Sequence, residues 1–258
     1  MSVLDSIIEG VKEDLESRKL SRAQILEAVE KAAAVRADIS SFQNNSLSLI
    51  AEVKRSSPSK GALAPISDPA LLASKYEKGG ASAISVLTER RRFGGSLEDL
   101  DAVRKAVDLP ILRKDFMIDE YQVYEAKAWG ADVILLIAAC LSPEQIKTLS
   151  QKAHELGLEV LLEIHDQEEL DRSPLEYVDI VGVNNRNLKN FAENNVNASL
   201  VLAEKIPANI IKISESCISE PETINLLKSA GYRGFLIGET FMKDASPGTK
   251  LGEFIAKI

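Results

Sequence analysis

The sequence contains few cysteines and few histidines, and this scarcity limits the chemistry that it can support. Its two cysteines, Cys140 and Cys217, are too few for a disulfide framework and too far apart for a zinc ribbon. Its two histidines, His154 and His165, are accompanied by no paired-cysteine spacing, so a transition-metal site is not expected. No glycine-rich dinucleotide fingerprint follows an apolar segment. We therefore expect neither a metal nor a cofactor.

Long apolar runs and an excess of positive charge are also absent. The longest apolar run, residues 133–141, is well short of the length that spans a bilayer, and the amphipathic N-terminus lacks a signal peptide's apolar stretch. Lysine and arginine total 31 against 39 aspartates and glutamates, a net charge of −8 that disfavours nucleic acid and anionic membranes. We expect a cytoplasmic protein that binds neither nucleic acid nor membrane.

Short apolar segments recur along the chain, and each is followed by a longer stretch with helical periodicity. They are nearly continuous hydrophobic runs, as is typical of parallel strands buried on both faces. Start and stop signals mark the helices between them, for example Ser142-Pro143 and Gly157. The predicted strands are residues 47–53, 81–88, 110–114, 132–139, 159–165, 180–185, 210–216 and 234–239.

Eight strand–helix units in 258 residues predict an α/β protein with the fold of a (β/α)8 TIM barrel, and an open doubly wound sheet is the alternative. No proline- or serine-rich linker interrupts the series, so residues 1–258 are expected to form a single domain. Residues 1–46 form an N-terminal helical extension with amphipathic stretches at about 3–19 and 21–37. Periodicity does not distinguish an extension that plugs the bottom of the barrel from one that covers its mouth.

Polar residues occur where several predicted strands end, and in such barrels the active site lies at the C-terminal ends of the strands. Solvated strand ends or ion pairs between neighbouring strands are the ordinary alternative. Charged groups converging on one rim favour a ligand site, because burying them around an empty mouth would be costly. The polar residues at these strand ends are Glu52, Lys54, Arg113, Lys114, Asp115, Glu163, Asn184, Arg186, Glu215 and Ser216.

Three loops have the small residues that phosphate binding favours: residues 56–59, Ser216-Cys217 and Gly238-Glu239. The last two match the frequent barrel phosphate site after strands seven and eight, although each alone could be an ordinary turn. His165 lies two residues after Glu163 and could face the site. A single histidine at a strand end is more often structural, and His154 is expected on the surface of a helix.

Seven motifs resemble those of the indole-3-glycerol phosphate synthase family in order and spacing, and together they cover residues 47–242. The first and third of them are highly specific in combination. They are IAEVKRSSPSKG (50–61), SVLTERRRFGGS (85–96), PILRKDF (110–116), LLEIH (161–165), GVNNRNL (182–188), ISESCIS (213–219) and FLIGETFM (235–242).

The resemblance implies a carboxy-lyase of tryptophan biosynthesis. Its substrate would be 1-(2-carboxyphenylamino)-1-deoxyribulose 5-phosphate, which loses carbon dioxide and water as it becomes indole-3-glycerol phosphate. Lys114 resembles the family's general acid, which protonates the ketone oxygen, and Glu163 its general acid/base. Glu52, Lys54 and Asn184 match groups that orient the substrate and complete the expected catalytic set.

The resemblance also implies a set of substrate-binding residues. Arg186 matches a residue near the anthranilate carboxylate, and Lys54 is expected to serve both that carboxylate and the phosphate. Ser57, Ser216, Gly238 and Glu239 lie on the family's phosphate loops, and Phe93, Phe116 and Leu135 match its apolar wall. Glu215, Cys217 and Leu236 complete the predicted set.

Two further expectations concern individual side chains. The ketone requires a proton donor near neutral pH, and we expect neighbouring cations to lower the pKa of Lys114 toward that range. Cys217 stands where the family has glycine, and a left-handed backbone there would cost about 1–2 kcal/mol. The alternatives are a negative φ, with the thiol pointing away from phosphate, or a thiol beside the phosphate pocket.

Two other functions compete with this one. A different phosphate-binding barrel enzyme, such as a sugar-phosphate isomerase, should lack both the Lys54/Lys114 pair and the apolar wall. A non-catalytic barrel that binds a phosphorylated ligand would have no need of Lys114 and Glu163. The expected partner is thus a small phosphorylated substrate, and we expect a monomer that is not fused to another pathway enzyme.

Overall fold

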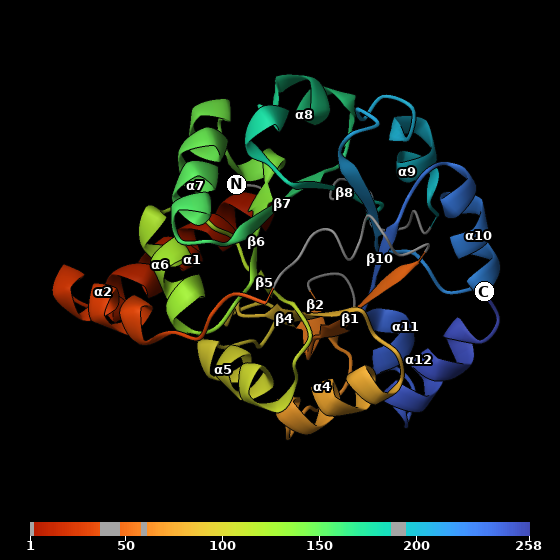
Figure 1. Cartoon of the computed structure of the whole chain (residues 1–258), viewed down its shortest axis with the longest axis horizontal. Helices are drawn as coiled ribbons and strands as arrows, with labels where there is room; N and C mark the ends of the chain where they lie inside the picture. The colour runs from red at the N-terminus through yellow and green to blue at the C-terminus, as the bar shows by residue number, and fades with distance from the viewer. Residues whose placement is uncertain (1–2, 37–46, 58–60, 187–194) are drawn as a thin grey trace.

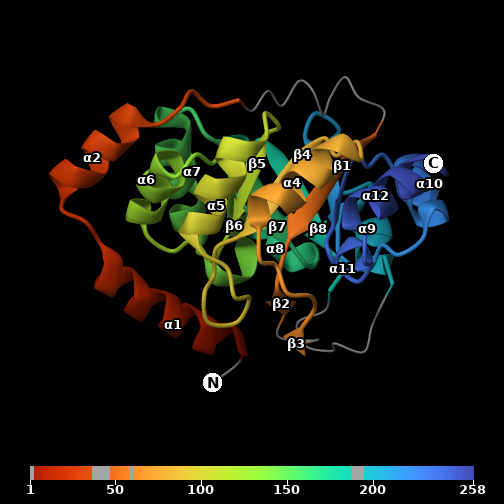
Figure 2. The same cartoon turned by 90° about the horizontal axis from the view of Figure 1, so that it is seen from below.

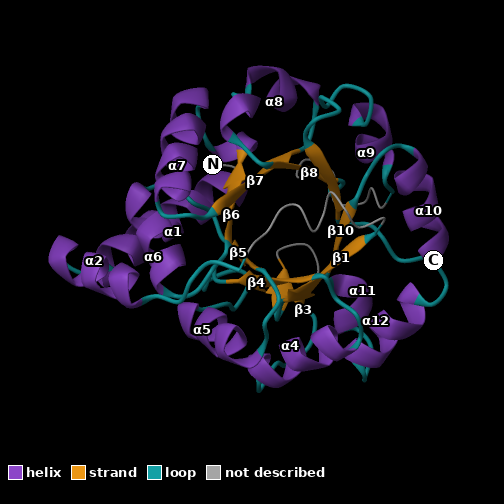
Figure 3. Ribbon diagram, in the orientation of Figure 1, coloured by secondary structure: helices purple, strands orange, loops and turns teal. Residues whose placement is uncertain are grey.

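The computed structural model of the chain describes residues 3–36, 47–57, 61–186 and 195–258. Eight parallel strands close into a barrel in the order β1-β10-β9-β8-β7-β6-β5-β4, and helices surround it (Figures 1 and 3). The predicted TIM barrel is confirmed, and the open doubly wound sheet is wrong. The strands are β1 (Ser48–Val53), β4 (Ala83–Leu87), β5 (Ile111–Lys114), β6 (Val133–Ile137), β7 (Glu159–Ile164), β8 (Ile180–Asn184), β9 (Ile211–Glu215) and β10 (Gly234–Ile237).

Helices follow the strands along the chain, and side chains cap the starts of α4, α5, α6, α7 and α8. Ser142 and Gln145 form a capping box at the start of α7, and Asp68 accepts a hydrogen bond from the backbone N–H of Leu71 in α4. The helices around the barrel are α4 (Pro69–Lys78), α5 (Leu97–Ala106), α6 (Glu120–Ala128), α7 (Pro143–Glu155), α8 (Gln167–Arg172), α9 (Asn197–Leu202), α10 (Pro221–Ser229), α11 (Glu239–Met242) and α12 (Pro247–Ile255), with short 3-10 turns η1 (Ala138–Cys140) and η2 (Leu175–Tyr177).

Strand β1 is followed by a small antiparallel hairpin that the sequence did not predict. It consists of β2 (Ser56–Ser57) and β3 (Gly61–Ala62), with Ser56 opposite Ala62. The predicted phosphate loop at 56–59 therefore begins as a strand, and Pro58 and Ser59 lie outside the described residues. The hairpin projects from the C-terminal end of β1 and so marks the mouth of the barrel (Figure 2).

Apolar side chains form two layers because successive residues of a strand point to opposite faces. An inner cluster fills the lower part of the barrel and includes Ile50, Leu112, Leu161 and Ile213. A larger outer cluster packs the other faces of the strands against the helices. Within the described part of the chain, no helix combines the length and the apolarity that crossing a membrane requires.

The N-terminal helices α1 (Val3–Arg18) and α2 (Arg22–Lys31) precede β1, as predicted. Helix α1 lies at the same end of the barrel as the β2–β3 hairpin, so its start borders the mouth and not the bottom (Figure 2). The expected extension of the second helix toward residue 37 is wrong, because α2 ends at Lys31 and Ala32 is extended. Asp132 accepts a hydrogen bond from the backbone N–H of Arg36 at 2.6 Å, which holds the chain beyond α2 against the barrel.

Gly248 allows the last helix, α12, to approach the first barrel helix, α4, at backbone distance. A Cβ on Gly248 would overlap the carbonyl oxygen of Lys75, whereas one on Gly252 would meet its nearest neighbour at an ordinary 3.6 Å. We predict that Gly248→Ala lowers the free energy of unfolding by about 1–3 kcal/mol through overpacking. Gly252→Ala, the matched control, should be neutral or gain up to about 1 kcal/mol from helix propensity. Urea denaturation of both variants measures the difference, and equal stabilities would contradict this helix contact.

Candidate active site

The residues that point into the barrel change from apolar to charged as each strand approaches its C-terminal end. Along β1, Ile50 belongs to the inner apolar cluster, whereas Glu52 and then Lys54 line a cavity at the mouth. The same two-residue step leads from Leu112 to Lys114 on β5. Strand alternation therefore gathers charges from separate strands into one layer above the apolar core.

Lys114 lies at the centre of this layer. Its Nζ donates to Oε2 of Glu163 on β7 at 2.9 Å and to Oε2 of Glu215 on β9 at 2.8 Å. Beside it, Nζ of Lys54 is 3.4 Å from Oε2 of Glu52. The other oxygen of Glu52 is buried and has no hydrogen-bond partner within the described part of the chain. One buried ammonium group thus joins two strand ends across the barrel.

The electrostatics of this centre contradict the expectation that neighbouring cations lower the pKa of Lys114. Burial does lower that pKa, but the attraction of Glu163, Glu215 and Glu52 outweighs burial and raises it above the ordinary value. The expectation was wrong because carboxylates, and not cations, surround the ammonium. Sequence spacing gave the residue types at the rim but not which of them are in contact.

The two carboxylates that hold Lys114 differ in their own pKa values. Burial would raise the pKa of Glu163, but Lys114, His165 and a hydrogen bond from Asn184 lower it to about 2. Burial raises the pKa of Glu215 to about 7, against the attraction of Lys114 and with the repulsion of Glu163. The pair therefore combines an ionised carboxylate with one that titrates near neutral pH.

Two glycines make room for the buried carboxylates. A Cβ on Gly182 of β8 would overlap Oε1 of Glu215, and one on Gly238 would overlap Oε2 of Glu52. Gly238 was predicted only as part of a phosphate loop. The structure adds a packing reason for glycine there, because the side chain of Glu52 occupies the space beside it.

The cavity above this layer has a volume of about 640 Å³, within the usual range for a small-molecule site. The rings of Phe93 and Phe116 lie 6.1 Å apart along its wall, and Nζ of Lys54 is 5.4 Å from the centre of the Phe93 ring. Twelve predicted site residues line it: Glu52, Lys54, Ser57, Phe93, Lys114, Phe116, Leu135, Glu163, Asn184, Arg186, Ser216 and Leu236.

Four predicted residues are not among the described residues that line the cavity: Glu215, Cys217, Gly238 and Glu239. Glu215 lies directly beneath it as a partner of Lys114, and Glu239 is 3.1 Å from the guanidinium group of Arg186. Cys217 packs against the outer apolar layer and has a φ of 60°, next to Ser216 with a φ of 65°. The alternative of a negative φ at Cys217 is therefore wrong.

The loop after β4, which carries Phe93, is held by a carboxylate that the sequence analysis did not single out. Oxygens of Glu89 accept hydrogen bonds from the backbone N–H groups of Arg91, Arg92 and Phe93 at 2.7–3.0 Å. The Arg91 and Arg92 side chains then reach helix α1, where Asp14 and Ser6 accept hydrogen bonds from them. The acidic residue before three arginines was the available sequence signal.

Helix α1 and the segment after β7 contribute further wall residues. Val3, Leu4 and Ile7 of α1 line the mouth, and only their amphipathic spacing could have suggested it. His165, Asp166, Glu168, Glu169 and Arg172 also line the cavity. Of these, only His165 is predicted from the sequence, as a residue that could face the site.

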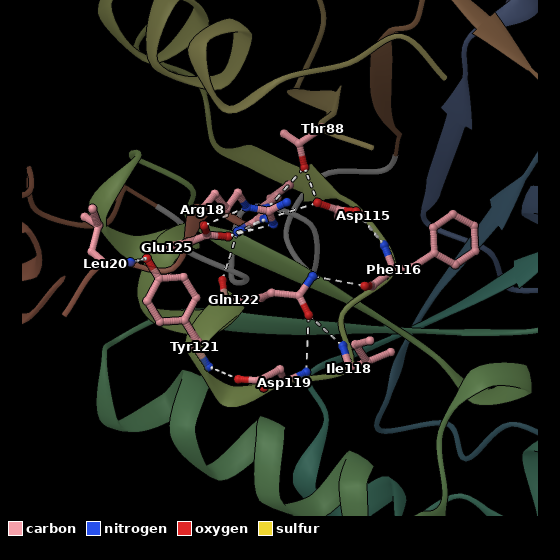
Figure 4. Close-up of polar contacts among 11 residues, drawn as sticks. Arg18, Leu20, Thr88, Asp115, Phe116, Ile118, Asp119, Tyr121, Gln122 and Glu125 are labelled. Atoms are coloured by element: carbon pink, nitrogen blue, oxygen red, sulfur yellow. Dashed lines mark hydrogen bonds and ion pairs between the residues drawn. The ribbon is translucent and has the colours of Figure 1, made fainter. Parts of the chain in front are cut away.

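Behind the cavity wall, a buried polar network fixes the end of β5 on both sides of Lys114. Arg113, which is fully buried, donates to Oδ2 of Asp115 at 2.9 Å and to Oε2 of Glu125 at 3.2 Å. Arg18 of helix α1 donates to the same Glu125, and Oδ1 of Asp115 accepts from the backbone N–H of Phe116 (Figure 4). The network therefore ties α1, Lys114's strand and the Phe116 wall together.

The fold and this site define a TIM-barrel enzyme with a buried lysine–carboxylate centre at its mouth. The sequence model of the indole-3-glycerol phosphate synthase family matches residues 4–254. The chain belongs to this family.

Similar proteins agree over almost the whole length. The indole-3-glycerol phosphate synthase of Paenarthrobacter aurescens is 48% identical over 265 residues, covering 99% of this chain and 96% of the relative. That of Bacteroides thetaiotaomicron is 47% identical over 245 residues, covering 95% and 94%. The chain is accordingly a carboxy-lyase with indole-3-glycerol phosphate synthase activity in tryptophan biosynthesis, and it acts on a phosphorylated substrate.

A solved structure adds support for the fold alone. The thiamine phosphate pyrophosphorylase from Pyrococcus furiosus aligns with a TM-score of 0.62 at 15% identity, covering 83% of this chain and 96% of that one. At this identity the likeness extends to the barrel and not to the chemistry.

The left-handed backbone at Cys217 leads to a stability prediction. Glycine accepts this conformation without strain, whereas alanine keeps the Cβ that makes it costly. We predict that Cys217→Gly is more stable than Cys217→Ala by about 1 kcal/mol, measured by urea denaturation. A glycine variant no more stable than the alanine variant would rule out a left-handed Cys217.

The raised pKa of Glu215 leads to a spectroscopic prediction. Its carboxyl group should be protonated below and ionised above a midpoint of about 7. Infrared difference spectra across this range should show a carboxyl band that disappears as the pH rises and that is missing in Glu215→Gln. A band that persists in Glu215→Gln would assign the titration to another group.

Proposed function

We propose that ring closure takes place directly above Lys114, with Lys114 as general acid and Glu163 as general acid/base. The observation that carries this proposal is the contact of one buried ammonium group with Glu163 and Glu215 on the floor of the cavity. Acid and base come from different rigid strands, so the barrel holds them in place before the substrate arrives.

The cavity accounts for the three parts of the substrate 1-(2-carboxyphenylamino)-1-deoxyribulose 5-phosphate. The aromatic ring would lie against Phe93, Phe116 and Leu135, which line one wall. Its carboxylate would meet the cations Lys54 and Arg186, which line the same cavity. Two anionic ends and an apolar ring thus match a cavity whose cations are local, in a chain of net charge −8.

The phosphate would bind on the loops after β1, β9 and β10. Ser57 and Ser216 line the cavity there, and Gly238 precedes α11. Backbone N–H groups and hydroxyl groups of such loops are good phosphate ligands. Cys217 and Glu239, the first residue of α11, lie on the same loops.

The reaction then needs three steps and takes up one proton overall, which restores Lys114 from solvent after turnover. The ring carbon that carries the carboxylate attacks the ketone carbon while Lys114 protonates the ketone oxygen, which forms the new carbon–carbon bond and a hydroxyl group. Loss of carbon dioxide returns the bonding electrons to the ring. The hydroxyl group then leaves as water as one proton is added to it and another is lost from the new ring, and Glu163 handles a proton in this sequence.

A raised pKa is compatible with Lys114 as the acid. Glu163, Glu215 and Glu52 keep Lys114 protonated, so it always has a proton to donate. The oxygen anion that would form on the ketone is a stronger base than a lysine amine, so the proton moves toward it. Glu52, Lys54 and Asn184 would orient the substrate around this transfer.

We further propose that the chain works as a single barrel domain and as a cytoplasmic monomer. Among the described residues, the large exposed apolar side chains are scattered over several helices and the connection between α1 and α2, and they do not gather on one element. They are Val3, Leu20, Leu26, Leu71, Val201 and Leu226.

The direct test of the general acid is Lys114→Met, which keeps the aliphatic stem and removes the proton donor. We expect kcat to fall by at least about 100-fold, while a substrate analogue still binds. Formation of indole-3-glycerol phosphate, followed by indole fluorescence, measures turnover, and calorimetry measures binding. Near-normal turnover would contradict the assignment.

If Arg186 binds the carboxylate of the substrate while separate loops bind its phosphate, Arg186→Ala should have a selective effect. It should raise KM by about tenfold, because a charged hydrogen bond to the carboxylate is lost, and hardly change the affinity for inorganic phosphate. Arg233→Ala is the control, because Arg233 is exposed just before β10, at the opposite end of the barrel. Equal losses for phosphate and for an anthranilate-bearing analogue would contradict this division.

A further inference from the structure

His165 follows β7 by one residue and lies two positions after Glu163, so that both side chains face the cavity. Its side chain is only 12% exposed. Nε2 of the imidazole is 3.5 Å from Oε1 of Glu163, the oxygen opposite the one that accepts from Lys114. That Nε2 is buried and has no hydrogen-bond partner among the residues that the structure describes.

Glu169 fixes the other side of the imidazole. Its Oε2 lies 3.1 Å from Nδ1 of His165 and also accepts a hydrogen bond from the backbone N–H of His165 at 2.7 Å. Glu169 is in the first turn of α8, whose N-cap Asp166 binds the Glu169 backbone N–H at 3.0 Å. The ring is therefore oriented by a carboxylate that is itself held by a helix start.

The two carboxylates determine the charge of the ring. A neutral imidazole has one N–H and one lone pair, so either tautomer would aim a lone pair at Glu163 or at Glu169. Only the doubly protonated ring presents an N–H to both. The distance of 3.5 Å to Glu163 is long for a hydrogen bond, and such contacts often tighten when substrate binds.

We propose that His165 is a positioning residue of the reaction, an imidazolium oriented by Glu169 that holds and compensates Oε1 of Glu163. This inference rests on the proposed role of Glu163. Lys114 neutralises one oxygen of that carboxylate only until it gives up its proton. His165 keeps a positive charge on the other oxygen throughout, so Glu163 stays ionised and in place when Lys114 becomes neutral.

The groups around His165 favour this charge. Burial lowers its pKa, but the hydrogen bond with Glu169 and the attraction of Glu163, Glu169 and Glu215 raise it overall above the ordinary value. On η1, burial raises the pKa of Cys140 to about 12, so its thiol adds no competing charge. Lys114, across Glu163, is the opposing cation in contact with the same carboxylate.

Three other charged residues of the same segment face the cavity. Asp166 and Glu168 add negative charge, and Arg172 donates to the carbonyl oxygens of Ala138 and Leu141. The guanidinium group of Arg172 is thus engaged on η1 and the residue that follows it. Carboxylates therefore outnumber cations around the imidazole.

The kinetic test compares His165→Ala and His165→Gln with the control His154→Gln. His154 is a partly exposed residue of α7 paired with Asp179, and it is the other histidine of the chain. We expect His165→Ala to lower kcat by about tenfold with KM within about twofold, because the base is misplaced and not the substrate. His165→Gln, whose amide can still donate to Oε1, should retain more activity than His165→Ala, and His154→Gln should match the unmodified enzyme.

Nuclear magnetic resonance gives a second readout that does not depend on turnover. With two histidines, the titration of each imidazole is resolved, and His154→Gln assigns them. We expect His165 to titrate above the ordinary histidine value and its pKa to fall in Glu163→Gln and in Glu169→Gln, because each change removes a negative charge beside the ring. Normal kcat in both His165 variants, or a His165 pKa that Glu163→Gln leaves unchanged, would overturn the inference.

The two proposals fail in different ways. An inactive Glu163→Gln together with fully active His165 variants would overturn the role of His165 and leave that of Glu163 intact. A Glu163→Gln enzyme with normal turnover would overturn the proposed base and the inference with it. If circular dichroism shows that the His165 variants do not fold, the His165 pKa values measured in Glu163→Gln and Glu169→Gln test the inference instead.

Discussion

The buried ammonium group of Lys114, held between Glu163 and Glu215, is the constraint on which the rest of the site depends. Each of the three side chains comes from a different strand, so only a closed barrel brings them to one point. Removing the cation would leave two carboxylates in a buried position, which is far more costly than an exposed pair. Gly238 beside Glu52 and Gly182 beside Glu215 leave room for these carboxylates.

Structure outside the barrel serves the same centre. Arg113 holds the strand end from behind, and its partner Glu125 also binds Arg18 of the N-terminal helix. The start of that helix forms part of the cavity mouth. The extension is therefore connected to the site in three ways: through apolar residues at the mouth, through the buried network behind Lys114's strand, and through hydrogen bonds from Arg91 and Arg92 of the loop that carries Phe93.

The barrel was predictable because buried parallel strands are continuous apolar runs. Polar cavity residues such as Lys114 were predictable because strand ends share one rim, whereas the apolar wall of Phe93, Phe116 and Leu135 was predicted only from the family resemblance. Which rim charges touch was not predictable, since pairing between strands depends on register and not on spacing along the chain. The pKa of Lys114 was therefore predicted with the wrong sign. The wall from α1 and the role of Glu89 were missed, because their apolar and acidic residues resemble those of any surface helix or loop.

Carboxylates, and not cations, determine whether the Lys114 side chain is protonated in the resting enzyme. Nuclear magnetic resonance of the lysine side chains, with Lys114→Met to assign the signal, measures this protonation directly. We predict that Lys114 is still an ammonium group at about pH 11, where an ordinary lysine is mostly deprotonated. A Lys114 signal that titrates near neutral pH would contradict it.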